Sequence, residues 1–139
     1  MNPLMPFFSP PDWSELAAEL QGKPWQTQQK LMIELAKALP AWPEDWQSED
    51  YRIAGCEVPV YLVRQPGMGV IPWAAWSPSK VVCGQLRLLQ SYDHFLSPRQ
   101  HTVDNLLAAF EIVGMSRRLP DSRRHGLQSV LSAVLADEG

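Results

Sequence analysis

The feature that most constrains this 139-residue chain is a run of three amphipathic helix patterns between Ser77 and Asp137. In each pattern the apolar residues recur at intervals of three and four, which places them on one face of a helix. Three such helices can hide their apolar faces against one another, so we expect residues 77–137 to form a three-helix core. The middle pattern is the most regular, and its apolar positions are Val103, Leu106, Leu107, Phe110 and Val113.

Capping residues separate the three patterns. Ser77–Pro78 is typical of a helix start, because serine caps an orphan amide and proline at the first position loses no hydrogen bond. Ser97–Pro98 repeats this pair, and Asp121 or Ser122 can cap the last helix. The first of these helices has the widest apolar face and is predicted to be central, with Gly84 permitting a close contact to a neighbouring helix.

The segment before this core predicts an arm and a helical hairpin. Four prolines within residues 1–11 favour an extended arm without helix. Asp12 opens a capping-box spacing and Thr27 is a second candidate cap, with Pro40 as a stop, so residues 12–39 are predicted to contain two helices.

Residues 51–76 change to β-type composition. We expect a hairpin with strands near 58–65 and 69–74, joined by a Pro-Gly turn, and a short partner strand at 51–55. The predicted fold class is therefore α+β, predominantly α-helical, with about five helices and a small antiparallel β-hairpin between helices 2 and 3. A length of 139 residues fits a single domain.

Composition and charge exclude several classes. The net charge is −3, and no apolar run approaches the length of about 18 residues needed to span a bilayer, so we expect a cytoplasmic protein without a membrane partner. Cys56 and Cys83 are the two cysteines, and their spacing is not that of a metal site. We interpret both as reduced, partly buried thiols, and packing explains Cys83 better than a nucleophilic role. No cofactor is predicted.

All six tryptophans lie in the first 76 residues. Four of them are candidates both for core packing and for partner binding, because tryptophan is favoured in either setting. A packing role between hairpin and helices is the favoured interpretation, and exposure would instead mark a binding patch. The four are Trp42, Trp46, Trp73 and Trp76.

Four arginines bracket the turn before the last helix: Arg117, Arg118, Arg123 and Arg124. This arginine corner is a candidate site for a protein partner. Nucleic acid is the alternative, although the last helix carries no basic residue beyond this corner with which to read a groove.

A third hypothesis is a small enzyme or metal site near Asp93, His94 and His101, although no established metal or catalytic spacing supports it. Because no catalytic motif is present, the leading prediction is a non-enzymatic protein-interaction module, such as a small bacterial adaptor, chaperone or immunity-type protein. Its oligomeric state is left open.

Overall fold

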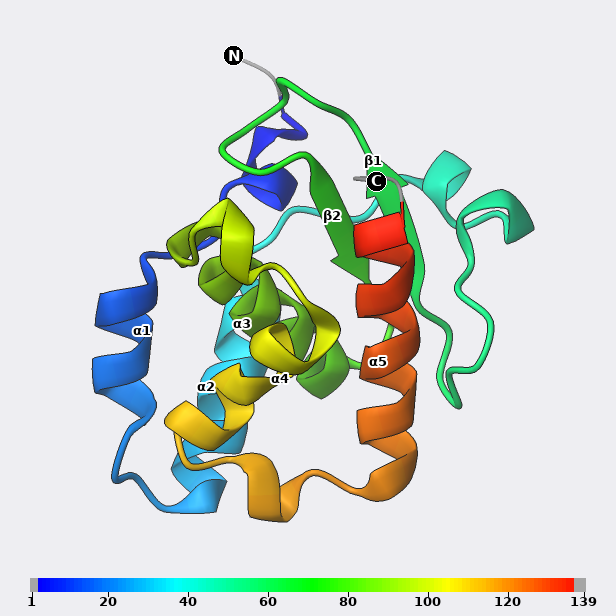
Figure 1. Ribbon diagram of the computed structural model, residues 1–139. Coiled ribbons are helices and arrows are strands. Elements are labelled where there is room, and N and C mark those ends of the chain that lie inside the picture. The colour runs from blue at the N-terminus through cyan, green and yellow to red at the C-terminus, as the bar shows by residue number, and fades with distance from the viewer. Residues whose placement is uncertain (1–2, 137–139) are drawn as a thin grey trace.

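The computed structural model describes residues 3–136 and confirms the predicted fold class, being about 59% helical with a two-stranded sheet between the second and third helices (Figure 1). The helices and strands are α1 (Trp13–Leu20), α2 (Trp25–Lys37), β1 (Tyr61–Arg64), β2 (Trp73–Trp76), α3 (Lys80–Phe95), α4 (Val103–Ile112) and α5 (Asp121–Ala136). Short 3-10 turns lie at Met5–Phe8, Glu44–Trp46, Glu49–Tyr51, Pro98–Gln100 and Ser116–Arg118.

Helix α3 occupies the centre, as predicted, with α1 and α5 on opposite sides of it in Figure 1. Its close neighbour is α2, and Gly84 is the reason. A Cβ atom at Gly84 would lie 2.1 Å from the backbone oxygen of Met32. The prediction that Gly84 permits a close helix contact is therefore confirmed.

The predicted starts of α4 and α5 are wrong. Ser97–Pro98 opens only the 3-10 turn, and α4 begins at Val103 after Thr102, whose side chain accepts from the Asn105 amide at 3.1 Å. Helix α5 begins at Asp121, so Asp121 and Ser122 lie inside its first turn.

The predicted starts of α3 and α2 are wrong as well. Helix α3 begins at Lys80 and is capped by Ser79, whose Oγ accepts from the Val82 amide at 3.3 Å. The Ser77–Pro78 pair instead follows directly after β2. Likewise, α2 begins at Trp25 after Pro24, so Thr27 lies inside its first turn and does not cap it.

The predicted cap at Asp12 is confirmed, because its side chain accepts from the Glu15 amide at 3.1 Å. The arm differs from the prediction of a wholly extended segment. Met5–Phe8 forms a 3-10 turn, which tolerates Pro6 because a proline near the start of a turn removes no needed hydrogen bond. Met1 and Asn2 lie outside the described residues.

The arm docks on its own chain. Phe7 and Phe8 are almost fully buried in a second apolar cluster with Trp42 and Trp46, and the Ile71 amide donates to the Phe8 carbonyl at 3.2 Å. Ring centroids of Phe7 and Trp42 lie 5.1 Å apart in an edge-on arrangement. The second cluster therefore closes the side of the hairpin that faces away from α3.

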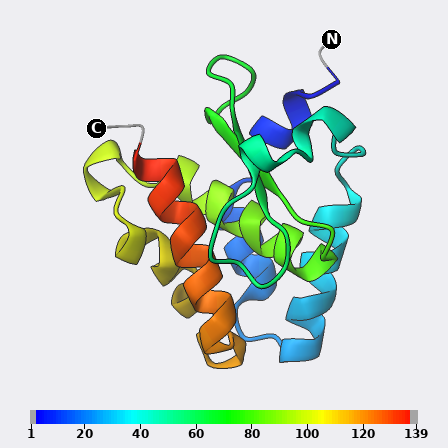
Figure 2. The same ribbon diagram turned by 90° about the vertical axis from the view of Figure 1, so that its right-hand side faces the viewer.

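The hairpin is shorter than predicted. Strands β1 and β2 pair antiparallel, with Tyr61 opposite Trp76 and Arg64 opposite Trp73. The predicted strand at 58–65 starts too early and that at 69–74 ends too early. The short partner strand predicted at 51–55 is absent as a strand, and among the described residues only one β-bridge forms there, between Arg52 and Tyr61. The residues between them form a loop (Figure 2).

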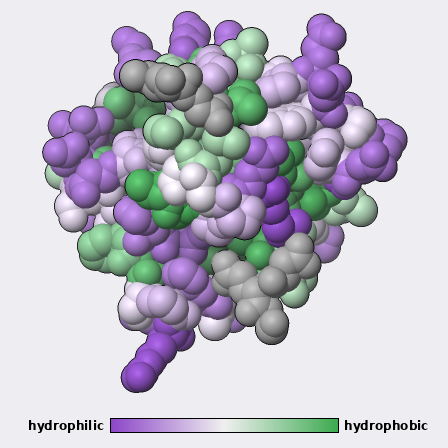
Figure 3. Space-filling view, turned by 90° about the horizontal axis from the view of Figure 1, so that it is seen from above, coloured by the Kyte–Doolittle hydropathy of each residue, from purple (hydrophilic) through white to green (hydrophobic). Residues whose placement is uncertain are grey.

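Among residues 3–136, no helix combines the length and the apolar character needed to cross a bilayer. Seen from above, hydrophilic residues alternate with small apolar areas (Figure 3).

Candidate functional site

The loop between the bridge and β1 presents a cysteine. Its ends are fastened by the Arg52–Tyr61 bridge and by the Ile53 amide, which donates to the Val60 carbonyl at 2.9 Å. Cys56 lies in the middle of this span, and the loop passes beside α5 in Figure 2. We call residues 53–60 the cysteine loop.

Two glycines allow the cysteine loop to sit directly on α5. Gly55 has a φ of +91°, in the region that favours glycine, and a Cβ atom there would meet the Ser129 Oγ at 2.9 Å. Gly126 lies on α5 opposite the thiol, where a Cβ would be 3.5 Å from the Cys56 Sγ. The Sγ also contacts the Gly126 carbonyl at 3.5 Å, so the thiol donates a weak hydrogen bond to α5.

A cavity of about 20 Å³ adjoins the thiol. This volume is enough for one water-sized atom and little more. Apolar side chains form most of the wall, Arg123 supplies a cationic group and Glu57 an anionic one. The lining residues are Cys56, Glu57, Val58, Val60, Val82, Ser122, Arg123, Gly126, Leu127 and Val130.

The two cysteines differ in their surroundings, although both are free thiols. Burial raises the pKa of Cys56, and the nearby Arg52 guanidinium partly opposes this by lowering it. Burial also raises the pKa of Cys83, which is only 2% exposed within α3. Cys56 is half-buried on a loop, so it is the thiol that a small movement of the backbone can expose.

The arginine corner is brought together at the turn between α4 and α5. The Arg123 Nη1 donates to the Gln85 Oε1 at 3.1 Å, and the Arg124 Nη2 approaches the Ser116 carbonyl at 3.4 Å. Neither arginine forms an ion pair with any residue between 3 and 136.

The other two arginines of the corner lie in the 3-10 turn before α5 and are exposed. The Arg118 guanidinium lies 5.0 Å from the ring centroid of Trp25, a cation–π arrangement between the corner and the start of α2. Within the described part of the chain, Arg117 and Arg118 also lack a carboxylate partner. The corner therefore presents cationic charge that its own described surroundings do not neutralise.

The four candidate tryptophans lie mainly inside the molecule. Trp42, Trp46 and Trp73 are buried, and Trp76 stacks on Trp42 with centroids 5.9 Å apart. The Trp73 Nε1 donates to the Asp93 Oδ2 at 2.7 Å. This burial favours the packing interpretation over a free binding patch, while Trp25, at 40% exposed, was not among the candidates.

Of the three residues proposed for an enzyme or metal site, the structure brings only Asp93 and His101 together. The His101 Nε2 lies 3.3 Å from the Asp93 Oδ1, and His94 is exposed on α3. No group of three histidine, cysteine or acidic side chains arranged for a metal occurs within residues 3–136.

Sequence reasoning did not single out Cys56 as a functional residue. The sequence did contain one signal. Cys56 follows a glycine in a short stretch between a loop and a β-type segment, whereas Cys83 lies in a predicted helix. The environment of the Cys56 thiol depends on its contact with Gly126, which lies far away in the sequence.

Comparison with known proteins adds to this geometry. Residues 15–137 match the family described as SufE, the Fe-S metabolism associated domain. The sulfur acceptor protein CsdE of Escherichia coli (strain K12) is 28% identical over 113 residues, covering 81% of this chain and 77% of that protein.

Proposed function

Because the chain belongs to the SufE family, we propose that it is a sulfur acceptor that carries sulfur on Cys56 as a persulfide. The observation that carries this proposal is the placement of Cys56 on a loop, with a cavity of about 20 Å³ beside its thiol. Cys83 offers no comparable access, because it is enclosed in the central helix.

The transfer is a thiol exchange. The Cys56 thiolate attacks the terminal sulfur of a persulfide on a donor protein, such as a cysteine desulfurase, and forms a new S–S bond. The S–S bond of the donor breaks, and the donor cysteine leaves as a thiolate that takes up a proton. The proton lost from Cys56 goes to solvent, so no external oxidant or reductant is consumed.

The cavity suits the product. One additional sulfur atom on Cys56 needs space for about one water-sized atom beside the Sγ, which matches the cavity volume. Walls such as Val60, Val82 and Leu127 keep water and small thiols away from the outer sulfur. Arg123 and Glu57 both line the cavity, and the guanidinium favours the anionic form of a persulfide while the carboxylate opposes it.

Loading requires the cysteine loop to move. In the docked loop, burial raises the pKa of Cys56 and the Sγ faces α5, so the nucleophilic thiolate is disfavoured. A loop that swings away from Gly126 brings the thiol into water and removes the cause of the raised pKa. Docking then stores the sulfur, and undocking presents it.

This role is a form of the protein-interaction function inferred from the sequence, with the protein acting as an adaptor for a sulfur atom between donor and recipient. It fits a reducing compartment such as the cytoplasm, where thiols stay free.

The test is transfer of labelled sulfur. A cysteine desulfurase is incubated with ³⁵S-cysteine and the purified protein, and the label is followed on a non-reducing gel together with the intact mass. Wild type gains one sulfur that a reductant removes, Cys56→Ser gains none, and the matched control Cys83→Ala is loaded like wild type. A Cys56→Ser protein that retained the label would refute the proposal.

A further inference from the structure

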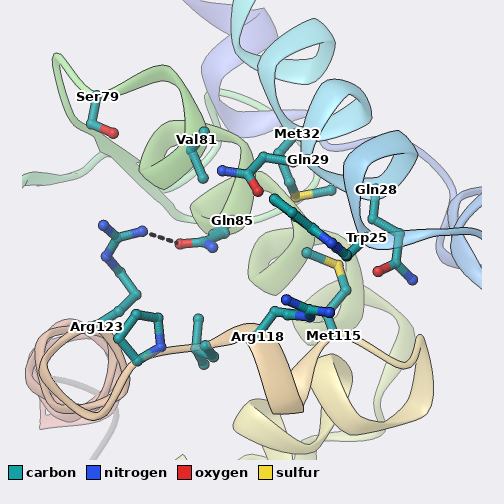
Figure 4. Close-up of a pocket in the computed structure, with 12 residues that line it drawn as sticks. Trp25, Gln28, Gln29, Met32, Ser79, Val81, Gln85, Met115, Arg118 and Arg123 are labelled. Atoms are coloured by element: carbon teal, nitrogen blue, oxygen red, sulfur yellow. Dashed lines mark hydrogen bonds between the residues drawn. The ribbon is translucent and has the colours of Figure 1, made fainter.

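A second, larger hollow lies next to the Cys56 cavity. It has a volume of about 330 Å³ and is formed by α2, the start of α3 and the arginine corner (Figure 4). Arg123 lines both this hollow and the cavity beside Cys56. We call the larger hollow the tryptophan pocket, after Trp25 on its edge.

The pocket combines positive charge with an apolar base. Arg118 and Arg123 line it and no carboxylate of the described chain does, while Met32 and Met115 contribute apolar surface. Figure 4 shows Trp25 above Arg118 and Arg123 turned toward Gln85. An occupant that complements this lining has a carboxylate beside an apolar group.

Both guanidinium groups are held in place without being neutralised. The indole of Trp25 supports Arg118 at 5.0 Å, and the Gln85 Oε1, on a side chain only 6% exposed, accepts from Arg123 at 3.1 Å. Each of these partners is uncharged. Within residues 3–136 neither arginine has an ion-pair partner, so each can still bind an anionic group.

The position of the pocket favours a protein as its source of carboxylate. A donor that delivers sulfur to Cys56 must cover the cysteine loop, and the adjoining surface across Arg123 is this pocket. Nucleic acid is less favoured, because α5 has no basic residue after Arg124 within the described chain other than the neighbouring His125, and the net charge is −3.

We propose that the tryptophan pocket docks an acidic side chain of the persulfide donor, flanked by an apolar residue, and so aligns the donor with Cys56. This inference rests on the proposed function. Contact at two neighbouring points, at the reacting sulfur beside Cys56 and at the charged groups of the pocket, fixes the orientation of the donor.

Charge reversal tests the docking. Arg118→Glu is compared with Arg99→Glu, which makes the same change at an exposed residue of the turn Pro98–Gln100, away from the arginine corner in Figure 1. The Kd for the desulfurase that loads Cys56 is measured by calorimetry, and KM and kcat by ³⁵S transfer. Arg118→Glu is expected to raise Kd and KM about tenfold or more, equivalent to ~1.4 kcal/mol, with a smaller effect on kcat.

Further variants separate the alternatives. Trp25→Ala is expected to raise Kd in the same direction, and Arg118→Lys to recover part of the affinity. Cys56→Ser is expected to bind the desulfurase with an unchanged Kd while accepting no sulfur. The Kd therefore reports docking, and ³⁵S transfer reports the reaction at the thiol. Equal Kd values for Arg118→Glu and Arg99→Glu would overturn the inference. So would a duplex DNA probe that binds wild type and is released by Arg118→Glu.

Discussion

The docked cysteine loop makes a quantitative prediction at Gly55. Its φ of +91° is unfavourable for any residue with a Cβ, and Gly55→Ala should cost roughly 1–3 kcal/mol in the docked state. The added Cβ would also lie 2.9 Å from the Ser129 Oγ, which could rotate away with the loss of one exposed hydrogen bond to the His125 carbonyl, about 1 kcal/mol or less. The backbone term therefore dominates.

The undocked loop can relax this strain, so the substitution shifts the docking equilibrium. A change of about 1–3 kcal/mol corresponds to a population change of about 5- to 150-fold. If the undocked loop is the form that reacts, iodoacetamide should alkylate Cys56 faster by a factor in this range. The alkylation rate is measured by intact mass in a Cys83→Ala background, so that Cys56 is the one thiol that can be alkylated.

Gly22→Ala is the matched control. Gly22 also has a positive φ, of +74°, and has no atom within 4 Å of a built Cβ among the described residues, but it lies in the turn between α1 and α2. It should lose similar global stability without accelerating alkylation. An unchanged rate in Gly55→Ala, or an equal acceleration in Gly22→Ala, would show that local undocking does not control access to Cys56.

Three further outcomes follow from the packing and the charges. Gly84→Ala should lower the urea midpoint, because its Cβ would lie 2.1 Å from the Met32 carbonyl oxygen. Overpacking costs roughly 1–3 kcal/mol or more, which exceeds the gain in helix propensity of up to ~1 kcal/mol. An unchanged midpoint would contradict this prediction. Arg52→Ala removes the cation that lowers the Cys56 pKa, so that pKa should rise and the pH profile of alkylation should move to higher pH; a shift to lower pH would contradict the assignment. Phe7→Ala should cost about 3–5 kcal/mol in urea unfolding, since its ring is 2% exposed, and a loss well below this range would indicate that the arm contributes little.

Local patterns were sufficient for much of the helical architecture. The apolar stripe of α4 and the cap at Asp12 depend on residues three or four positions apart, and both were predictable. The close approach at Gly84 was also anticipated, because a glycine on a wide apolar face leaves room for the backbone of a neighbouring helix.

Competing local signals caused the errors in boundaries. Ser77 and Ser79 are both acceptable caps; in the structure the Ser77 Oγ accepts from the Ser79 amide at 3.2 Å, and Ser79 caps the helix. Thr27 has a side chain suited to capping, yet Pro24 occupies the N-cap position and Trp25 is the first helical residue. In each case a competing residue two or three positions away formed the start, which the capping preference of Ser77 or Thr27 alone could not reveal.

The sequence by itself determined five helices, a small hairpin and an arginine-rich turn, because periodicity and capping act between near neighbours. Only the tertiary structure decided that Cys56 lies against Gly126, 70 residues away, and that Arg118 meets Trp25. Such contacts depend on how the elements pack, so no local pattern encodes them. The same packing buried Trp42 and Trp73 and left Trp25 exposed, a distinction that their shared chemistry could not make.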